Sequence, residues 1–113
     1  MIGLPKELAG LYAACRDGRA ALVISTVNLA EVLIHTEKYA RASGVDPIAF
    51  LKASGLRIHP PDEAIARRVA KLKTSRADGF AAATAQELSV RFHTTDGELV
   101  RQLRGVRLAI THY

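Results

Sequence analysis

Short apolar runs alternate with helix-forming segments along the whole chain. Residues 20–25 (AALVIS) are a continuous apolar run with β-branched members, which is typical of a strand buried on both faces. Residues 56–59, 90–93 and 106–110 are shorter strand candidates. We therefore expect four short strands, each separated from the next by a helix.

Helical patterns and cap signals fill the intervening segments. Pro5 opens a helix that should end near Arg16, where Asp17 and Gly18 stop it. Asn28 suits an N-cap and Glu31 follows three residues later, as in a capping box, which predicts a helix to about residue 43. Further helices are expected over residues 47–53, 63–73, 75–88 and 98–103.

This alternation predicts an α/β fold with right-handed crossovers between parallel strands. The expected architecture is a three-layer α/β/α sandwich around a mostly parallel central sheet. A length of 113 residues leaves room for one domain, residues 1–113. With 49% hydrophobic residues, 5% aromatics and no Trp, its core must consist mainly of Ala, Leu, Val and Ile.

The chain is basic and nearly free of cysteine. Sixteen Lys and Arg against eleven Asp and Glu give a net charge of +5, which favours nucleic acid as a partner. Arg67, Arg68, Lys71 and Lys73 form either an RNA-facing patch or a solvated helix face. Cys15 has no partner for a disulfide, which indicates a reducing compartment, and its apolar surroundings predict a buried, inert thiol. Without a secretory or membrane signal, the expected location is the cytoplasm.

Three carboxylates occupy comparable positions in these elements. Glu31 and Asp78 are expected in first helical turns, and Asp96 just past the end of the strand over residues 90–93. Capping explains each of them alone. Three at one sheet edge would repel one another unless a cation neutralised them, and Mg²⁺ prefers such oxygen ligands. The set therefore suggests a metal site suited to phosphodiester hydrolysis.

Three segments resemble motifs of VapC-type PIN domains. Residues 24–33 (ISTVNLAEVL) are very similar to the segment that carries the family's second acidic residue. Residues 77–85 (ADGFAAATA) resemble the third acidic motif, and residues 94–99 (TTDGEL) resemble the fourth. The motifs occur in the family's order and the resemblance covers nearly the whole chain.

The resemblance implies a toxin endoribonuclease that depends on Mg²⁺ or Mn²⁺. It further implies parallel strands between helices, an RNA substrate, a small antitoxin protein as partner and a homodimer. Carried over by position, Glu31, Asp78 and Asp96 would be the catalytic metal ligands. Ser25, Asn28 and Thr94 would be supporting residues that orient carboxylates or waters.

The family pattern also contains an N-terminal feature that has no match here. It begins with an apolar strand that ends in Asp, lies at the centre of the sheet and supplies the first metal ligand. This chain starts at Met1 with a segment that matches the family's second helix, and Asp17 is explained by its helix-ending turn. A late start codon, a fragment and a decayed family member are the competing explanations. We expect at best a weak nuclease from these 113 residues.

Other functional interpretations remain open. A non-catalytic remnant would keep only a surface for binding an antitoxin or itself, and an unrelated α/β binding module would make the three motif matches coincidental. His35 and Glu98 could add metal ligands, although an exposed helix residue and a first-turn acid explain them more simply. His59, His93 and His112 each stand alone near strand ends, without ligand spacing.

Overall fold

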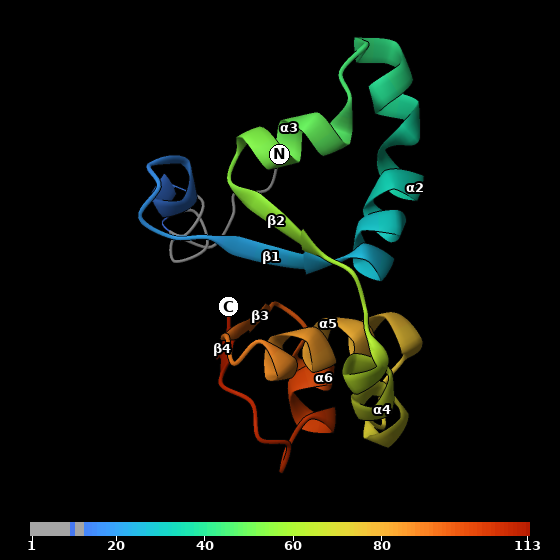
Figure 1. Cartoon of the computed structure of the whole chain (residues 1–113), viewed down its shortest axis with the longest axis vertical. Helices are drawn as coiled ribbons and strands as arrows, with labels where there is room; N and C mark the ends of the chain where they lie inside the picture. Colours follow the sequence, from blue (N-terminus) through green and yellow to red (C-terminus); the bar gives the residue numbers. More distant parts are fainter. Residues whose placement is uncertain (1–9, 11–12) are drawn as a thin grey trace.

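The computed structural model describes Gly10 and residues 13–113, and strands alternate with helices along this part of the chain (Figure 1). The elements are β1 (Leu22–Ser25), α2 (Thr26–Ser43), α3 (Pro47–Ala53), β2 (Leu56–His59), α4 (Glu63–Lys71), α5 (Arg76–Glu87), β3 (Phe92–Thr94), α6 (Gly97–Gln102) and β4 (Ile110–His112). The expected α/β class is confirmed. None of the helices in these residues is both long enough and apolar enough to cross a membrane.

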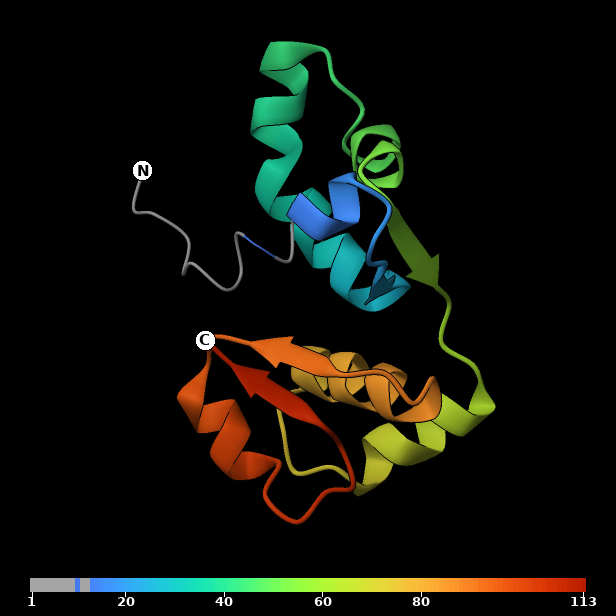
Figure 2. The same cartoon turned by 90° about the vertical axis from the view of Figure 1, so that its left-hand side faces the viewer.

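The strands pair in parallel, as expected, but they do not form the expected single central sheet. β1 pairs with β2, with Leu22 opposite Leu56, and β3 pairs with β4, with Phe92 opposite Ile110. Each pair is a separate two-stranded sheet because no hydrogen bonds join β1 to β3 among the described residues. Figures 1 and 2 show β1 and β2 with α2 and α3 in one half of the molecule, and the remaining elements in the other.

The second half contains the main hydrophobic core. Ala82, Leu99 and Leu103 form a buried cluster. The partly buried side chains packed against it are Leu72, Phe92, Val106, Leu108 and Ile110. Ile65 of α4 and Ala83 of α5 are also fully buried. This core consists mostly of aliphatic residues and alanines, as the composition predicted.

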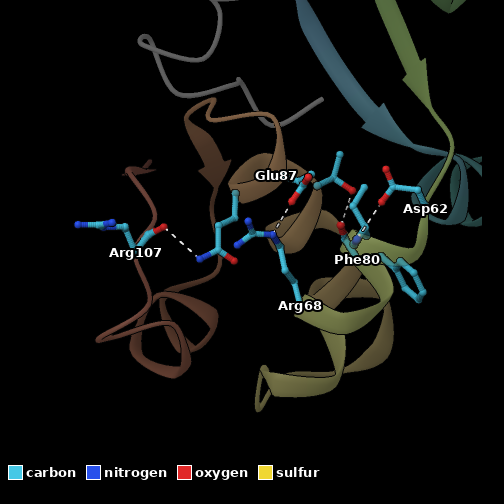
Figure 3. Close-up of polar contacts among 8 residues, drawn as sticks. Asp62, Arg68, Phe80, Glu87 and Arg107 are labelled. Carbon is cyan, nitrogen blue, oxygen red and sulfur yellow. Dashed lines mark hydrogen bonds and ion pairs between the residues drawn. The ribbon is translucent and has the colours of Figure 1, made fainter.

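Helices α4 and α5 pack closely because α5 presents small residues. A Cβ atom placed on Gly79 would lie 3.1 Å from Thr74 Oγ1 and 3.3 Å from Val69 Cγ1. Polar contacts add to this packing (Figure 3): Arg68 Nε donates to Glu87 Oε2 at 2.6 Å and joins the two helices. At the start of α4, the Ile65 amide donates to Asp62 Oδ1 at 2.9 Å and caps the helix.

Several element boundaries differ from those predicted. Helix α2 starts at Thr26, so the prediction that Asn28 is its N-cap is wrong. The last strand covers Ile110–His112 instead of residues 106–110. Val106 and Leu108 lie in irregular chain and pack on the core, after Gly105 turns the backbone at φ 87°. The helix expected over residues 5–16 falls partly outside the described residues. Residues 13–16, which the structure does describe, are helical.

Candidate acidic site

The start of α2 is fixed by Ser25, the last residue of β1. Its side chain is 2% exposed, and its Oγ accepts a hydrogen bond from the Val27 amide at 3.2 Å. A short hydroxyl directly after an apolar strand can cap the next helix without an intervening loop. Thr26 is therefore the first helical residue, and Glu31 lies in the second turn, exposed to solvent. The expected first-turn position of Glu31 is wrong, and capping does not account for this carboxylate.

Asn28 joins the start of α2 to the start of α5. Its Nδ2 donates a hydrogen bond to the Ala77 carbonyl oxygen at 2.9 Å, across 49 residues of sequence. Ala77 directly precedes Asp78, so this contact ties the helix that carries Glu31 to the first turn that carries Asp78. Asn28 Oδ1 is buried without a hydrogen-bond donor in the part of the chain that the structure describes. The amide thus has an unused acceptor beside the candidate site.

Asp78 lies in the first turn of α5, as predicted. Ser75 is the N-cap of this helix, and its Oγ accepts from the Asp78 amide at 3.4 Å. The same hydroxyl donates to Asp78 Oδ2 at 2.8 Å. This reciprocal contact fixes the direction of the carboxylate, and Oδ1 has no donor among the described residues.

Asp96 follows β3 and acts as the N-cap of α6. Its Oδ1 accepts hydrogen bonds from the Glu98 amide at 2.9 Å and the Leu99 amide at 3.2 Å. Thr94 Oγ1 accepts from the Asp96 amide at 3.0 Å and fixes the turn between strand and helix. Asp96 thus stands past the carboxyl end of its strand, as expected, with Oδ1 engaged in capping.

The structure links these residues in pairs. Asn28 connects two helix starts, Ser75 holds Asp78, and Thr94 holds the Asp96 turn. Within Gly10 and residues 13–113, no group of three or more His, Cys, Asp or Glu side chains is gathered closely enough to hold a metal ion. The convergence of Glu31, Asp78 and Asp96 on one ion therefore stays a prediction.

Some of the other candidate metal ligands and RNA-binding cations already form ion pairs within the protein. Glu98 pairs with Arg101, and His35 is an exposed residue of α2. In the basic cluster, Arg67 pairs with Glu63 and Arg68 with Glu87. Two of its four cations are thus partly neutralised, which weakens the interpretation of this helix as an RNA-facing patch.

His93 of β3 contacts a residue that is distant in the sequence. Its Nδ1 is hydrogen-bonded to the Tyr113 hydroxyl at 2.7 Å, and the two rings stack with centroids 5.7 Å apart. Burial, followed by the nearby charge of Arg91, lowers the pKa of His93 from its ordinary value of 6.5. Only the pairing of β3 with β4 brings these residues together, so spacing in the sequence gave no signal for the contact.

We expect the stability of the protein to fall as the pH drops below 6.5. The folded state favours the neutral His93 ring, whereas the unfolded chain takes up a proton near pH 6.5. The stabilisation is thus fully present above this value and is lost as the pH falls through the lower, folded-state pKa. Urea unfolding between pH 5 and 8 would measure this. His93→Gln should flatten the profile, and an unchanged profile would contradict the assignment to His93.

Neither the models of protein families, nor the curated proteins, nor the solved structures with which the chain was compared gave a match. Interpretation of the site therefore depends on the chain's own residues and their contacts.

Proposed function

We propose that this chain is a PIN-like, metal-dependent endoribonuclease domain, the toxin of a toxin–antitoxin pair. The observation that carries the proposal is the hydrogen bond from Asn28 to the Ala77 carbonyl oxygen. It ties the helix that carries Glu31 to the helix that carries Asp78. Both residues lie in sequence motifs that resemble the acidic motifs of PIN domains. The proposal includes the three-layer PIN-like architecture, an RNA substrate, a small antitoxin as partner and a homodimer.

The donor atoms suit a hard divalent cation. Glu31, Asp78 and Asp96 offer carboxylate oxygens, the ligands that Mg²⁺ and Mn²⁺ prefer. Asp78 Oδ1 and Asp96 Oδ2 accept no hydrogen bond from the described residues. Each of these two oxygens could therefore bind a cation while the second oxygen of the same carboxylate keeps its present hydrogen bonds. A bound divalent ion would polarise a phosphoryl oxygen and lower the pKa of a bound water.

The chain's own residues have distinct tasks in this proposal. Ser75 orients Asp78 through its hydroxyl, and Thr94 fixes the backbone that presents Asp96. Asn28 holds two helix starts together and offers its unused Oδ1 as an acceptor for a water or a hydroxyl group. Ser25 has a structural task, because its hydroxyl caps α2. The net charge of +5 favours RNA association through salt-sensitive contacts.

We expect the purified chain to cleave RNA slowly with Mg²⁺ or Mn²⁺ and to stop when the metal is chelated. The rate should be low because three carboxylates match the family pattern where four are usual. Glu31→Gln, Asp78→Asn and Asp96→Asn should each reduce cleavage and Mn²⁺ affinity about tenfold or more. Losing a supporting contact at a metal site already costs about 10–100-fold, and losing a ligand should cost at least as much.

Two matched variants control for charge and capping. Glu37→Gln removes an exposed carboxylate from the same helix as Glu31, where it pairs with Arg41. Asp46→Asn alters the N-cap of α3 as Asp96→Asn alters that of α6. Both controls should leave cleavage and Mn²⁺ binding unchanged. The metal-site proposal fails if no Mn²⁺ binds, or if the controls weaken Mn²⁺ binding as much as the test variants do. Either result would favour the non-catalytic interpretation.

A further inference from the structure

A recess lined by cations lies at the amino ends of β1 and β2. Its volume is about 480 Å³, and three positively charged residues line it: Arg19, Lys52 and Arg57. They come from three separate segments, namely the turn before β1, the last turn of α3 and the strand β2. No carboxylate of the described residues lines the recess. Glu31, by contrast, lies on the helix that follows the carboxyl end of β1, so the recess is separate from the candidate acidic site.

Backbone contacts hold the walls of the recess in place. β1 and β2 pair with Leu22 opposite Leu56, which fixes the two basic segments that adjoin these strands. On another side, Gly55 has a φ of 90°, and a Cβ placed on it would lie 3.3 Å from the Cys15 carbonyl oxygen. Glycine adopts this conformation without strain and leaves room for the approach. The helical turn at residues 13–16 therefore packs directly on the turn between α3 and β2.

Most of the positive charge in the recess has no counterion among the described residues. Lys52 and Arg57 form no ion pair there, whereas Arg19 pairs with Asp17 at 3.0 Å. The side chains of this pair are 67% and 60% exposed, so the contact contributes little and can be exchanged for another partner. The dipole of α3 favours a cation at Lys52, but Arg57 lies on a strand and has no such explanation. Cations that line one recess repel one another unless an anion neutralises them.

We propose that this recess binds a phosphate group. A guanidinium group presents its N–H donors in a planar fork that matches the oxygens of phosphate, and the lysine adds a compact charge. A phosphate monoester carries a charge of about −1.5 to −2 at pH 7, which complements several cations better than the single charge of a carboxylate does. The volume of about 480 Å³ falls in the range of small-molecule sites, about 300–1,000 Å³, so the phosphate can carry an attached nucleoside.

Inorganic phosphate is the first probe, added to the full 113-residue chain in chelator so that metal binding plays no part. We expect the melting temperature to rise with phosphate until binding saturates, because a ligand of the folded state stabilises it. Acetate at equal ionic strength should have little effect. Arg57→Gln and Lys52→Gln should each weaken phosphate binding about tenfold or more. Arg57→Lys keeps the charge without the fork and should bind with intermediate affinity.

Arg104→Gln is the matched control, because it removes one positive charge from an exposed residue outside the recess. It should leave the affinity for phosphate almost unchanged. Asp78→Asn should also leave it unchanged, so that failure of the metal site and failure of the recess can be told apart. Lys52 and Arg57 are exposed residues, and circular dichroism establishes that each variant is folded.

Two short single-stranded RNAs that differ only in a 5′-phosphate identify the source of the phosphate group. Tighter binding of the phosphorylated RNA, lost in Arg57→Gln, assigns the recess to the end of a strand. Equal binding of both RNAs, weakened by Arg57→Gln but not by Arg104→Gln, assigns it to the phosphodiester backbone. Binding of inorganic phosphate without either RNA assigns it to a small phosphorylated molecule.

Two results would overturn the proposal. One is stabilisation that acetate matches, or that Arg104→Gln weakens as much as Arg57→Gln does, because either indicates nonspecific attraction to a basic surface. The other is no binding of phosphate by the parent chain. Glu7 lies outside the described residues, and phosphate binding by Glu7→Gln but not by the parent would mean that a carboxylate of this chain neutralises the recess.

Discussion

Replacing Ile65 with alanine should lower the free energy of unfolding by about 2–5 kcal/mol. Ile65 is fully buried and is the largest of the completely enclosed side chains described. It is a residue of α4, the helix that packs against α5, and its complete burial means that its loss would leave a cavity that the surrounding structure can fill only in part. Domains of this size are commonly stable by only about 5–15 kcal/mol, so a large share of the stability is at stake.

An exposed isoleucine gives the matched control for Ile65→Ala. Ile34 lies on α2 and is 72% exposed, so Ile34→Ala removes the same atoms without opening a cavity. Urea unfolding of the parent and both variants should show a clear fall in the midpoint for Ile65→Ala and a change within about 0.5 kcal/mol for Ile34→Ala. Equal effects of the two substitutions would mean that the packing of α4 on α5 is not as described.

Valine in place of Gly79 should destabilise the protein by about 1–3 kcal/mol through overpacking. Even a Cβ at this position would lie 3.1 Å from Thr74 Oγ1 and 3.3 Å from Val69 Cγ1, so the two additional methyl groups would force α5 away from α4. Gly79→Ala should cost less, because the better helix propensity of alanine offsets part of the strain. The ordering Gly79, then alanine, then valine can be measured by thermal unfolding.

Gly10 is the control for Gly79→Val. Gly10 itself is helical, and a Cβ built there meets no atom of the described residues within 4 Å. Gly10→Val should therefore change the melting temperature very little. If Gly79→Val changes the melting temperature as little as Gly10→Val does, the spacing between α4 and α5 is wider than described. Close packing against α4 would then not explain the small residues of α5.

Local signals predicted the elements whose ends are set by their own residues. Helix α3 begins after Asp46, which accepts the Ile48 amide at 3.1 Å, and Pro47 fits its first turn, so this element was predicted correctly. β2 also has its predicted bounds. The start of α2 was mispredicted because two residues there can cap a helix. Ser25 takes that task, which leaves Asn28 to reach α5.

Contacts between distant segments could not be predicted in this way. The pairing of His93 with Tyr113 depends on the register of β3 with β4, and the contact from Asn28 to Ala77 depends on how two helices meet. For the candidate site, the sequence correctly placed Asp78 in a first turn and Asp96 past a strand. It did not reveal that an Asp96 oxygen is engaged in a cap.

The division into two strand pairs also bears on how cooperatively the chain unfolds. Most of the fully buried side chains, including Ile65, Ala83 and Leu103, lie beyond residue 60, in the half that contains the main core. The other half relies on one strand pair, on α2 and α3, and on its contacts with α5. Regions with fewer buried contacts open at lower free energy, as separate units. The half with β1 and β2 would then open first and expose the start of α2. Glu31 would therefore leave its folded position more often than Asp78 and Asp96, which lie in the half with the main core.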